Sequence, residues 1–155
     1  MHTIGCNLHW VELPFKHISK STIGVSPTPG IYKGPLADQL TGDIHLQSVT
    51  HFTAIKTSNK LELSEEFIED LSNDQRLLYE CYKAVTTGKI SEEWLGRRIG
   101  PMTEARWMTR SIRVLALYTR KQNPSDSVID LVKFIIHIYV PGWFSIKQSI
   151  IMSKV

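Results

Sequence analysis

The chain has 155 residues, of which 42% are hydrophobic and 21% charged, and its formal net charge at pH 7 is +3. The length suits one domain, and the apolar fraction excludes a chain that stays disordered for lack of a core. The small net charge does not by itself indicate a polyanion partner, and two cysteines without framework spacing exclude a disulfide-stapled scaffold. We therefore expect a single domain over residues 1–155. No signal-peptide pattern opens the sequence, which favours an intracellular location, nuclear or cytoplasmic.

Residues 1–20 predict a helix whose apolar pattern is interrupted by a proline. Four apolar side chains recur on one face at helical spacing: Leu8, Val11, Phe15 and Ile18. Pro14 lies within this pattern, and because it lacks a backbone donor it should kink or end the helix. Two shorter helices are therefore an equal alternative to one.

Residues 21–62 are expected to be irregular, because three prolines and three glycines fall between Gly24 and Pro35. The stretch GPLADQL predicts a short helix that Pro35 would begin. The stretch HLQSVTHFTAI alternates loosely between polar and apolar residues. It favours one short strand or an extended loop equally, since no partner strand is recognisable.

Residues 63–155 carry clear helix signals and predict a helical bundle. Ser72 and Gln75 form a capping box, and Gly88 stands where a left-handed C-cap is expected. The apolar face of the helix between them consists of Leu77, Leu78, Cys81, Ala84 and Val85. The fold class is therefore mainly α, with the bundle in the C-terminal half and a long Pro/Gly-rich loop in the N-terminal half.

Three further helices begin at serine or threonine caps, over residues 91–98, 103–123 and 125–139. The last of them is apolar on most sides, which is typical of a central helix. Pro141 should end it, because proline cannot continue a regular helix. One or two more turns are expected between residues 143 and 152.

The helix over residues 103–123 raises the functional question. On a helical wheel, a stripe of roughly 100° holds all five of its cations: Arg106, Arg110, Arg113, Arg120 and Lys121. Trp107 borders the stripe. Forked guanidinium donors beside an indole suit a phosphate backbone and an unstacked base. A solvated helix face is the alternative, as are ion pairs with the acidic segment Glu62–Asp74.

Other chemistry has weaker signals. Cys6 and His9 lie one helical turn apart and are weak candidates for a metal site, but no second ligand pair has usable spacing. No nucleophile elbow, phosphate loop or dinucleotide fingerprint is present in the sequence. We expect no cofactor, no small-molecule substrate and no enzymatic activity.

Three stretches, Cys6–Ile18, Tyr32–Leu40 and Leu71–Lys147, resemble in order a family of largely uncharacterised invertebrate proteins related to transposable elements. The Cys-x-x-His pair followed later by Arg-Trp also resembles the ribonuclease-H-like domain of hAT-type DNA transposases. This resemblance implies that Cys6 and His9 are buried markers of the fold, and that Arg106 and Trp107 lie near DNA.

The same resemblance implies that three carboxylates should serve two-metal strand transfer. Two of them should precede Cys6, where only five residues stand, and the chain ends 48 residues beyond Trp107. We therefore expect a non-catalytic fragment of a transposable-element-derived protein, with weak nucleic-acid binding.

The alternative is a helical protein-interaction module without nucleic-acid binding. In that case a protein partner would cover the apolar helix Val128–Tyr139. A membrane is not expected, because the apolar stretch is shorter than the roughly 20 residues that a membrane span requires.

Overall fold

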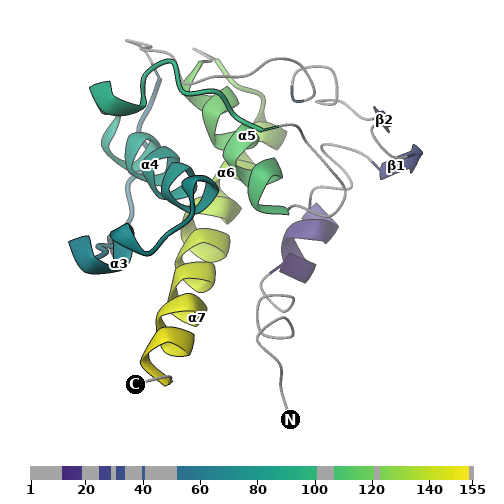
Figure 1. Cartoon of the computed structure of the whole chain (residues 1–155). Helices are drawn as coiled ribbons and strands as arrows, with labels where there is room; N and C mark the ends of the chain where they lie inside the picture. Colours follow the sequence, from purple (N-terminus) through teal and green to yellow (C-terminus); the bar gives the residue numbers. More distant parts are fainter. Residues whose placement is uncertain are drawn as a thin grey trace.

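Two helices, α4 (Asn73–Thr87) and α5 (Trp107–Thr119), pack against each other and form the centre of the molecule (Figure 1). The computed structural model describes residues 12–18, 25–28, 31–33, 40, 52–100, 107–120 and 123–153. The described part is mainly α-helical, as predicted.

The ends of α4 are those that the sequence predicts. The Ser72 hydroxyl accepts from the Gln75 backbone N–H at 3.3 Å, and the Gln75 side chain accepts from the Ser72 N–H at 3.0 Å. At the other end Gly88 takes a left-handed conformation, with φ of 82°, and donates to the Ala84 carbonyl at 2.8 Å. The capping box and the C-cap are therefore both confirmed.

The helix predicted over residues 91–98 is much shorter in the structure. Only a 3₁₀ turn forms, at η1 (Glu92–Trp94), and the Ser91 side chain makes no capping hydrogen bond. Gly96 has φ of 76°, a left-handed conformation that a helix cannot contain. On the N-terminal side of α4, a short helix α3 (Glu65–Glu69) begins at Ser64, whose hydroxyl accepts from Phe67.

The last predicted helix does not stop at Pro141. After α6 (Asp126–Phe134), which Ser125 caps as predicted, the chain continues through a π-helical segment, η2 (Ile135–Tyr139), into α7 (Val140–Ser153). Figure 1 shows one continuous rod that extends beyond the rest of the bundle. The predicted end is wrong because a wider π turn precedes the proline.

The hydrogen bonds of η2 explain how the proline is accommodated. The Val140 N–H donates to the Ile135 carbonyl, five residues back instead of four. In a regular α-helix the ring of Pro141 would collide with the carbonyl of residue 137. The wider turn moves this carbonyl away, so the helix continues without a break.

The buried side chains of this rod follow a four-residue repeat: Val128, Leu131, Val132, Ile135, Ile136, Tyr139, Val140, Trp143 and Phe144. A regular α-helix has 3.6 residues per turn, so this face would rotate by about 160° over its sixteen residues. One extra residue in a π turn reduces the rotation to about 60°. The π segment therefore keeps the apolar face of α6 and α7 directed at the same core.

The N-terminal half contains a hairpin where only loop was expected. Strands β1 (Val25–Thr28) and β2 (Ile31–Lys33) pair antiparallel with an irregular register. The candidate strand in HLQSVTHFTAI lies largely outside the described residues, and its described part, residues 52–55, is extended without a strand partner. Its backbone is held instead by the Ile55 N–H, which donates to the Val85 carbonyl at 2.9 Å.

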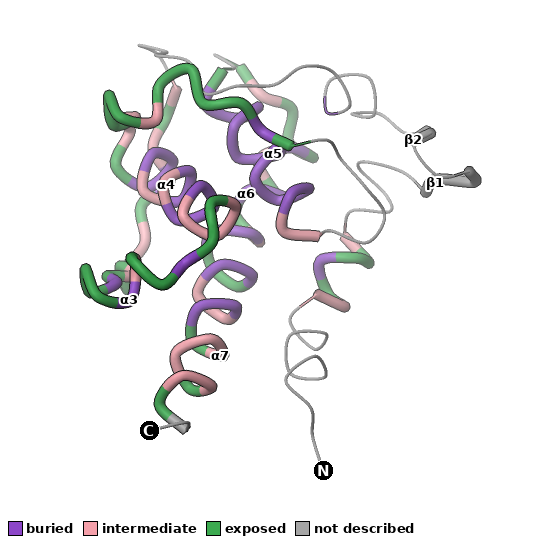
Figure 2. Tube along the Cα trace, in the orientation of Figure 1, coloured by how far each residue is buried: buried purple, intermediate pink, exposed green. Residues whose placement is uncertain are grey.

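Residues 12–18 form the described part of the first predicted helix, and Pro14 lies inside it. The Phe15 side chain is fully buried between Trp107, Phe134 and Tyr139, with ring centroids 5.1–6.3 Å apart. Figure 2 shows the buried residues concentrated in α4, α5 and α6, whereas the outer turns of α7 are only partly covered.

By length and composition alone, the helix Asp126–Met152 could cross a membrane, although core helices of soluble proteins meet the same criterion. A membrane was not expected because the apolar helix was predicted to end at Tyr139 and would then be too short to span one. That premise is wrong, because the helix is 27 residues long. The expectation of no membrane remains a prediction.

Candidate functional site

The middle of α5 is buried on all sides, and its arginines are buried with it. Arg113 is 4% exposed and donates to three backbone carbonyls: Gly100 at 2.7 Å, Leu40 at 2.6 Å and Ile99 at 3.3 Å. Two chain segments, around residue 40 and at residues 99–100, are therefore held onto α5 by one guanidinium. This side chain connects distant parts of the fold and does not face solvent.

Arg110 is also buried, at 5% exposure, and its guanidinium carbon lies 4.1 Å from the centroid of the Trp107 ring. The ring centroids of Trp107 and Phe15 lie 5.4 Å apart in a T-shaped contact. Trp107 is only half-buried. Arg110 nevertheless covers one face of its ring, and Phe15 from residues 12–18 contacts the same ring. The indole therefore packs at the edge of the core.

These contacts correct part of the predicted nucleic-acid surface. The expectation that Arg110 and Arg113 face outward is wrong, because segments far away in sequence cover the helix face on which they lie. The Trp107 ring is not open for stacking on a base either, because the Arg110 guanidinium lies over it. Arg106 and Lys121 lie outside the described residues, and Arg120 is exposed just after the end of α5.

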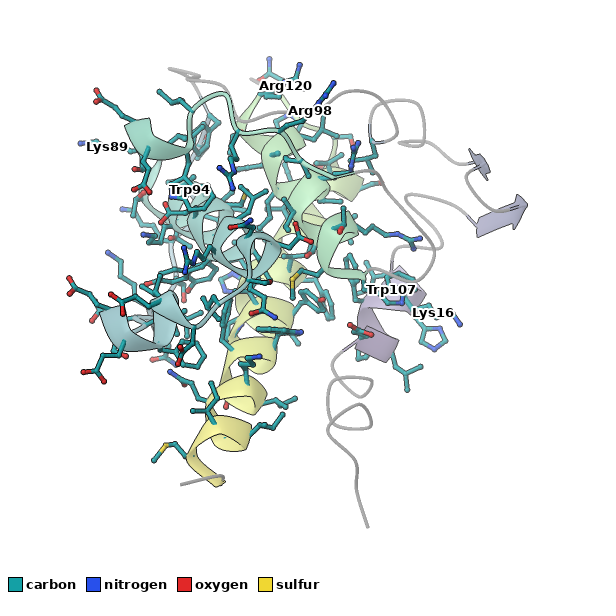
Figure 3. All side chains as sticks on the ribbon, in the orientation of Figure 1. Lys16, Lys89, Trp94, Arg98, Trp107 and Arg120 are labelled. Carbon is teal, nitrogen blue, oxygen red and sulfur yellow. The ribbon has the colours of Figure 1, made fainter. Side chains whose placement is uncertain are left out.

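Exposed cations gather at a different place, the end of the bundle where α4 and α5 finish. We call this surface the basic end, and it consists of Lys89, Arg97, Arg98 and Arg120 with the half-buried Trp94. Figure 3 labels Arg98 and Arg120 at this end of the bundle, with Trp94 and Lys89 away from them to one side. The Arg97 guanidinium carbon lies 5.3 Å from the centroid of the Trp94 ring.

Two carboxylates, Glu92 and Glu93, are exposed in the same segment and reduce its charge. Four cations and two carboxylates leave the basic end with a net charge of +2. Most of the exposed acids of the acidic segment belong to the opposite end of α4, in α3 and the residues beside it: Glu62, Glu65, Glu66, Glu69 and Asp70. A 15-residue helix is about 22 Å long. The exposed acids beside the start of α4 and the exposed cations of the basic end are therefore separated in space.

The segregation follows the dipole of α4. Carboxylates near a helix N-terminus and cations near its C-terminus are both stabilised by the helix dipole. Arg76 contacts the acidic segment, and its side chain donates to the Ile68 carbonyl at 3.1 Å and to the Glu69 carbonyl at 2.7 Å. Of the arginines that the helical wheel placed on the outer stripe, Arg110 and Arg113 are buried and Arg120 is exposed.

The weak metal candidates, Cys6 and His9, lie outside the described residues. Within the part that the structure describes, no group of three or more His, Cys, Asp or Glu side chains could hold a metal ion. Cys81 is fully buried in α4, and burial together with the charge of Glu80 raises the pKa of its thiol. The thiol therefore stays protonated at neutral pH and is a poor nucleophile.

No protein-family model, curated protein or solved structure matches the chain. The resemblance to transposable-element proteins thus stays a prediction from the residues that carry it.

Proposed function

We propose that the chain is a non-catalytic nucleic-acid-binding module that contacts phosphates through the basic end. The observation that supports it is the exposure of Arg97, Arg98 and Arg120 at one end of the bundle, while the acidic segment lies at the other. We thus retain the nucleic-acid binding expected of a transposable-element-derived protein. The surface proposed for it is the end of α5 and not its middle.

The chemistry of the basic end suits a single strand. Arginine side chains bind phosphate oxygens through forked donors, and the Trp94–Arg97 pair offers a flat cationic surface against which an unstacked base can lie. Lys89 adds a further exposed point charge to the basic end. With four cations the binding is weak and salt-dependent, with a log–log slope of at most about −3 for a single strand.

Fluorescence anisotropy with a labelled single-stranded oligonucleotide tests the proposal. Arg97→Glu combined with Arg98→Glu should lower the affinity at least tenfold and flatten the salt dependence, because two phosphate contacts become repulsive. The matched control is Lys16→Glu with Lys60→Glu, which makes the same change in net charge away from the basic end. Equal losses in the two double variants would show that only net charge matters, and would reject the basic end as the site.

A second candidate, a protein-interaction module, is supported by the exposed apolar side chains of the long helix. Ile138 is 54% exposed and Met152 is 76% exposed. The sequence-based reason for a partner, an uncovered Val128–Tyr139 helix, is largely removed, because α5 and Phe15 pack against this helix and most of its apolar side chains are buried. The partner surface would instead comprise the exposed Ile138 in η2 and the outer half of α7 with Met152.

Amide hydrogen exchange separates the two candidates. A protein partner with an apolar groove should slow exchange in α7 and leave the basic end unchanged. An oligonucleotide should slow exchange at residues 89–98 and leave α7 unchanged. Protection of neither surface by any bound molecule would remove both proposals.

A further inference from the structure

We infer that a groove between residues 53–56 and the α6–η2 helix binds a small organic anion, an acidic group on an apolar body. The cavity has a volume of about 630 Å³ and is open to solvent at one side. This size falls within the range of small-molecule sites, roughly 300–1,000 Å³. The inference is independent of the basic end and goes beyond the sequence-based expectation of no small-molecule ligand.

The polar wall of the groove is cationic. Lys56 comes from the extended segment, and Lys133 and His137 lie one helical turn apart on the opposite side. All three are exposed, and no carboxylate lines the cavity. Within the described residues, none of the three forms an ion pair. The two ammonium groups and the imidazole N–H are therefore available to an acidic ligand from solvent.

The groove also has an apolar base. Ile55 and Tyr118 are buried at its bottom, and the half-buried Ile129 and Pro124 complete it. An inorganic anion would contact the cations and leave this apolar surface in water. A ligand with a hydrocarbon or aromatic body would cover it, which contributes roughly 25 cal/mol per Å² of apolar area. The lining thus favours an amphipathic anion over a free phosphate.

The wall that carries Lys56 is fixed and does not depend on a ligand for its position. The Tyr118 hydroxyl donates to the Thr53 carbonyl at 2.6 Å, and the Ile55 N–H donates to the Val85 carbonyl at 2.9 Å. Phe52 packs against Tyr118, and the centroids of the two rings lie 6.2 Å apart. A preformed wall lowers the entropy that binding must overcome.

The opposite wall contains the π segment. His137 lies in its middle, and Lys133 lies in the α-helical turn before it. Asn123, in the connection between α5 and α6, adds an amide at the rim that can donate to an oxyanion. Cations from two separate chain segments therefore converge on one cavity with an apolar base.

Isothermal titration with three probes tests the inference: decanoate, phenyl phosphate and inorganic phosphate, with decanol as the uncharged counterpart of the first. We expect decanoate or phenyl phosphate to bind at one site and to perturb the backbone amide signals of Asn123 and His137. The two organic probes distinguish a carboxylate from a phosphate as the preferred acidic group. Equal binding of decanol, or binding of inorganic phosphate alone, would overturn the inference.

Lys133→Gln with His137→Gln should lower the affinity for the organic anion at least tenfold, since two charge-assisted hydrogen bonds are lost. Both side chains are exposed, so the fold should not change. The matched control is Lys89→Gln with Arg98→Gln at the basic end, which should leave this binding unchanged. If the control weakens binding as much, or neither organic probe binds, the groove is not the site.

Discussion

Arginines in two regions of this molecule have opposite roles. In the middle of α5, Arg110 and Arg113 are buried against an indole and against backbone carbonyls. At the basic end, Arg97 and Arg120 are exposed. The difference lies in what covers each residue, not in its spacing along a helix. A stripe of cations on a helical wheel is a binding surface only where no other segment of the chain packs over it.

The largest effect should come from the carbonyl-bound arginine. Arg113→Met leaves three backbone carbonyls without this donor, and we expect it to lower the free energy of unfolding by about 3 kcal/mol. The matched substitution Arg120→Met, on an exposed side chain, should change it by less than about 0.5 kcal/mol. Urea unfolding measures both. Similar losses in the two variants would remove the distinction between the two regions.

Alkaline pH should destabilise the folded state through the buried thiol of Cys81. An exposed cysteine thiol has a pKa of 9.0, and burial raises that of Cys81 well above this value. Above pH 9 the unfolded state therefore releases a proton that the folded state keeps, so stability falls as pH rises. Each pH unit above 9 should cost about 1.4 kcal/mol from this group.

Cys81→Ala is the control for the alkaline effect. It should lower stability at neutral pH, because a buried side chain is truncated, but it should flatten the pH dependence between 9 and 10. Unfolding followed by circular dichroism at several pH values gives both quantities. An unchanged slope in the variant would show that another group releases the proton.

Arg110 should have an intermediate effect. Its guanidinium lies over the Trp107 ring, and a buried contact of this type contributes about 2 kcal/mol or less. We expect Arg110→Met to lower the unfolding free energy by about 1–2 kcal/mol, because the methionine keeps part of the packing. Trp107→Leu in the same background should cost less than in the wild type. Additive losses would mean that the two side chains do not interact.

The smallest effect concerns the N-cap of α4, which lies at the opposite end of this helix from the basic end. Ser72→Ala removes one half of the capping box and should cost about 1 kcal/mol. Ser91→Ala is the control, since the Ser91 side chain makes no capping hydrogen bond and should cost little. Thermal unfolding distinguishes the two variants, and equal losses would contradict the assignment of the caps.

Local signals predicted the parts of the fold that local interactions determine. Ser72, Gln75 and Gly88 act within one turn of the chain, and the structure contains the helix that they delimit. Ser125 likewise caps α6. In contrast, Ser91 heads only a 3₁₀ turn, because a cap contributes too little to extend a helix past a left-handed Gly96.

The burial of α5 could not be predicted from its own residues. The covering carbonyls come from Leu40, 73 residues away in the sequence, and from the loop at Ile99 and Gly100. The groove has the same origin, since its two walls are separated by about eighty residues from Lys56 to Lys133 and His137. A wheel describes one helix and contains no information about such partners.

The π segment also had a signal in the sequence, the four-residue spacing of apolar side chains from Val128 to Phe144. A regular helix would need one residue fewer to connect the same two packed faces. Deleting Ile138, together with Pro141→Ala, should therefore convert residues 135–139 into a regular α-helix. The packing of α7 against α4 should be preserved. The chain length at this point is set by geometry, so relatives with one residue fewer here should also lack the proline.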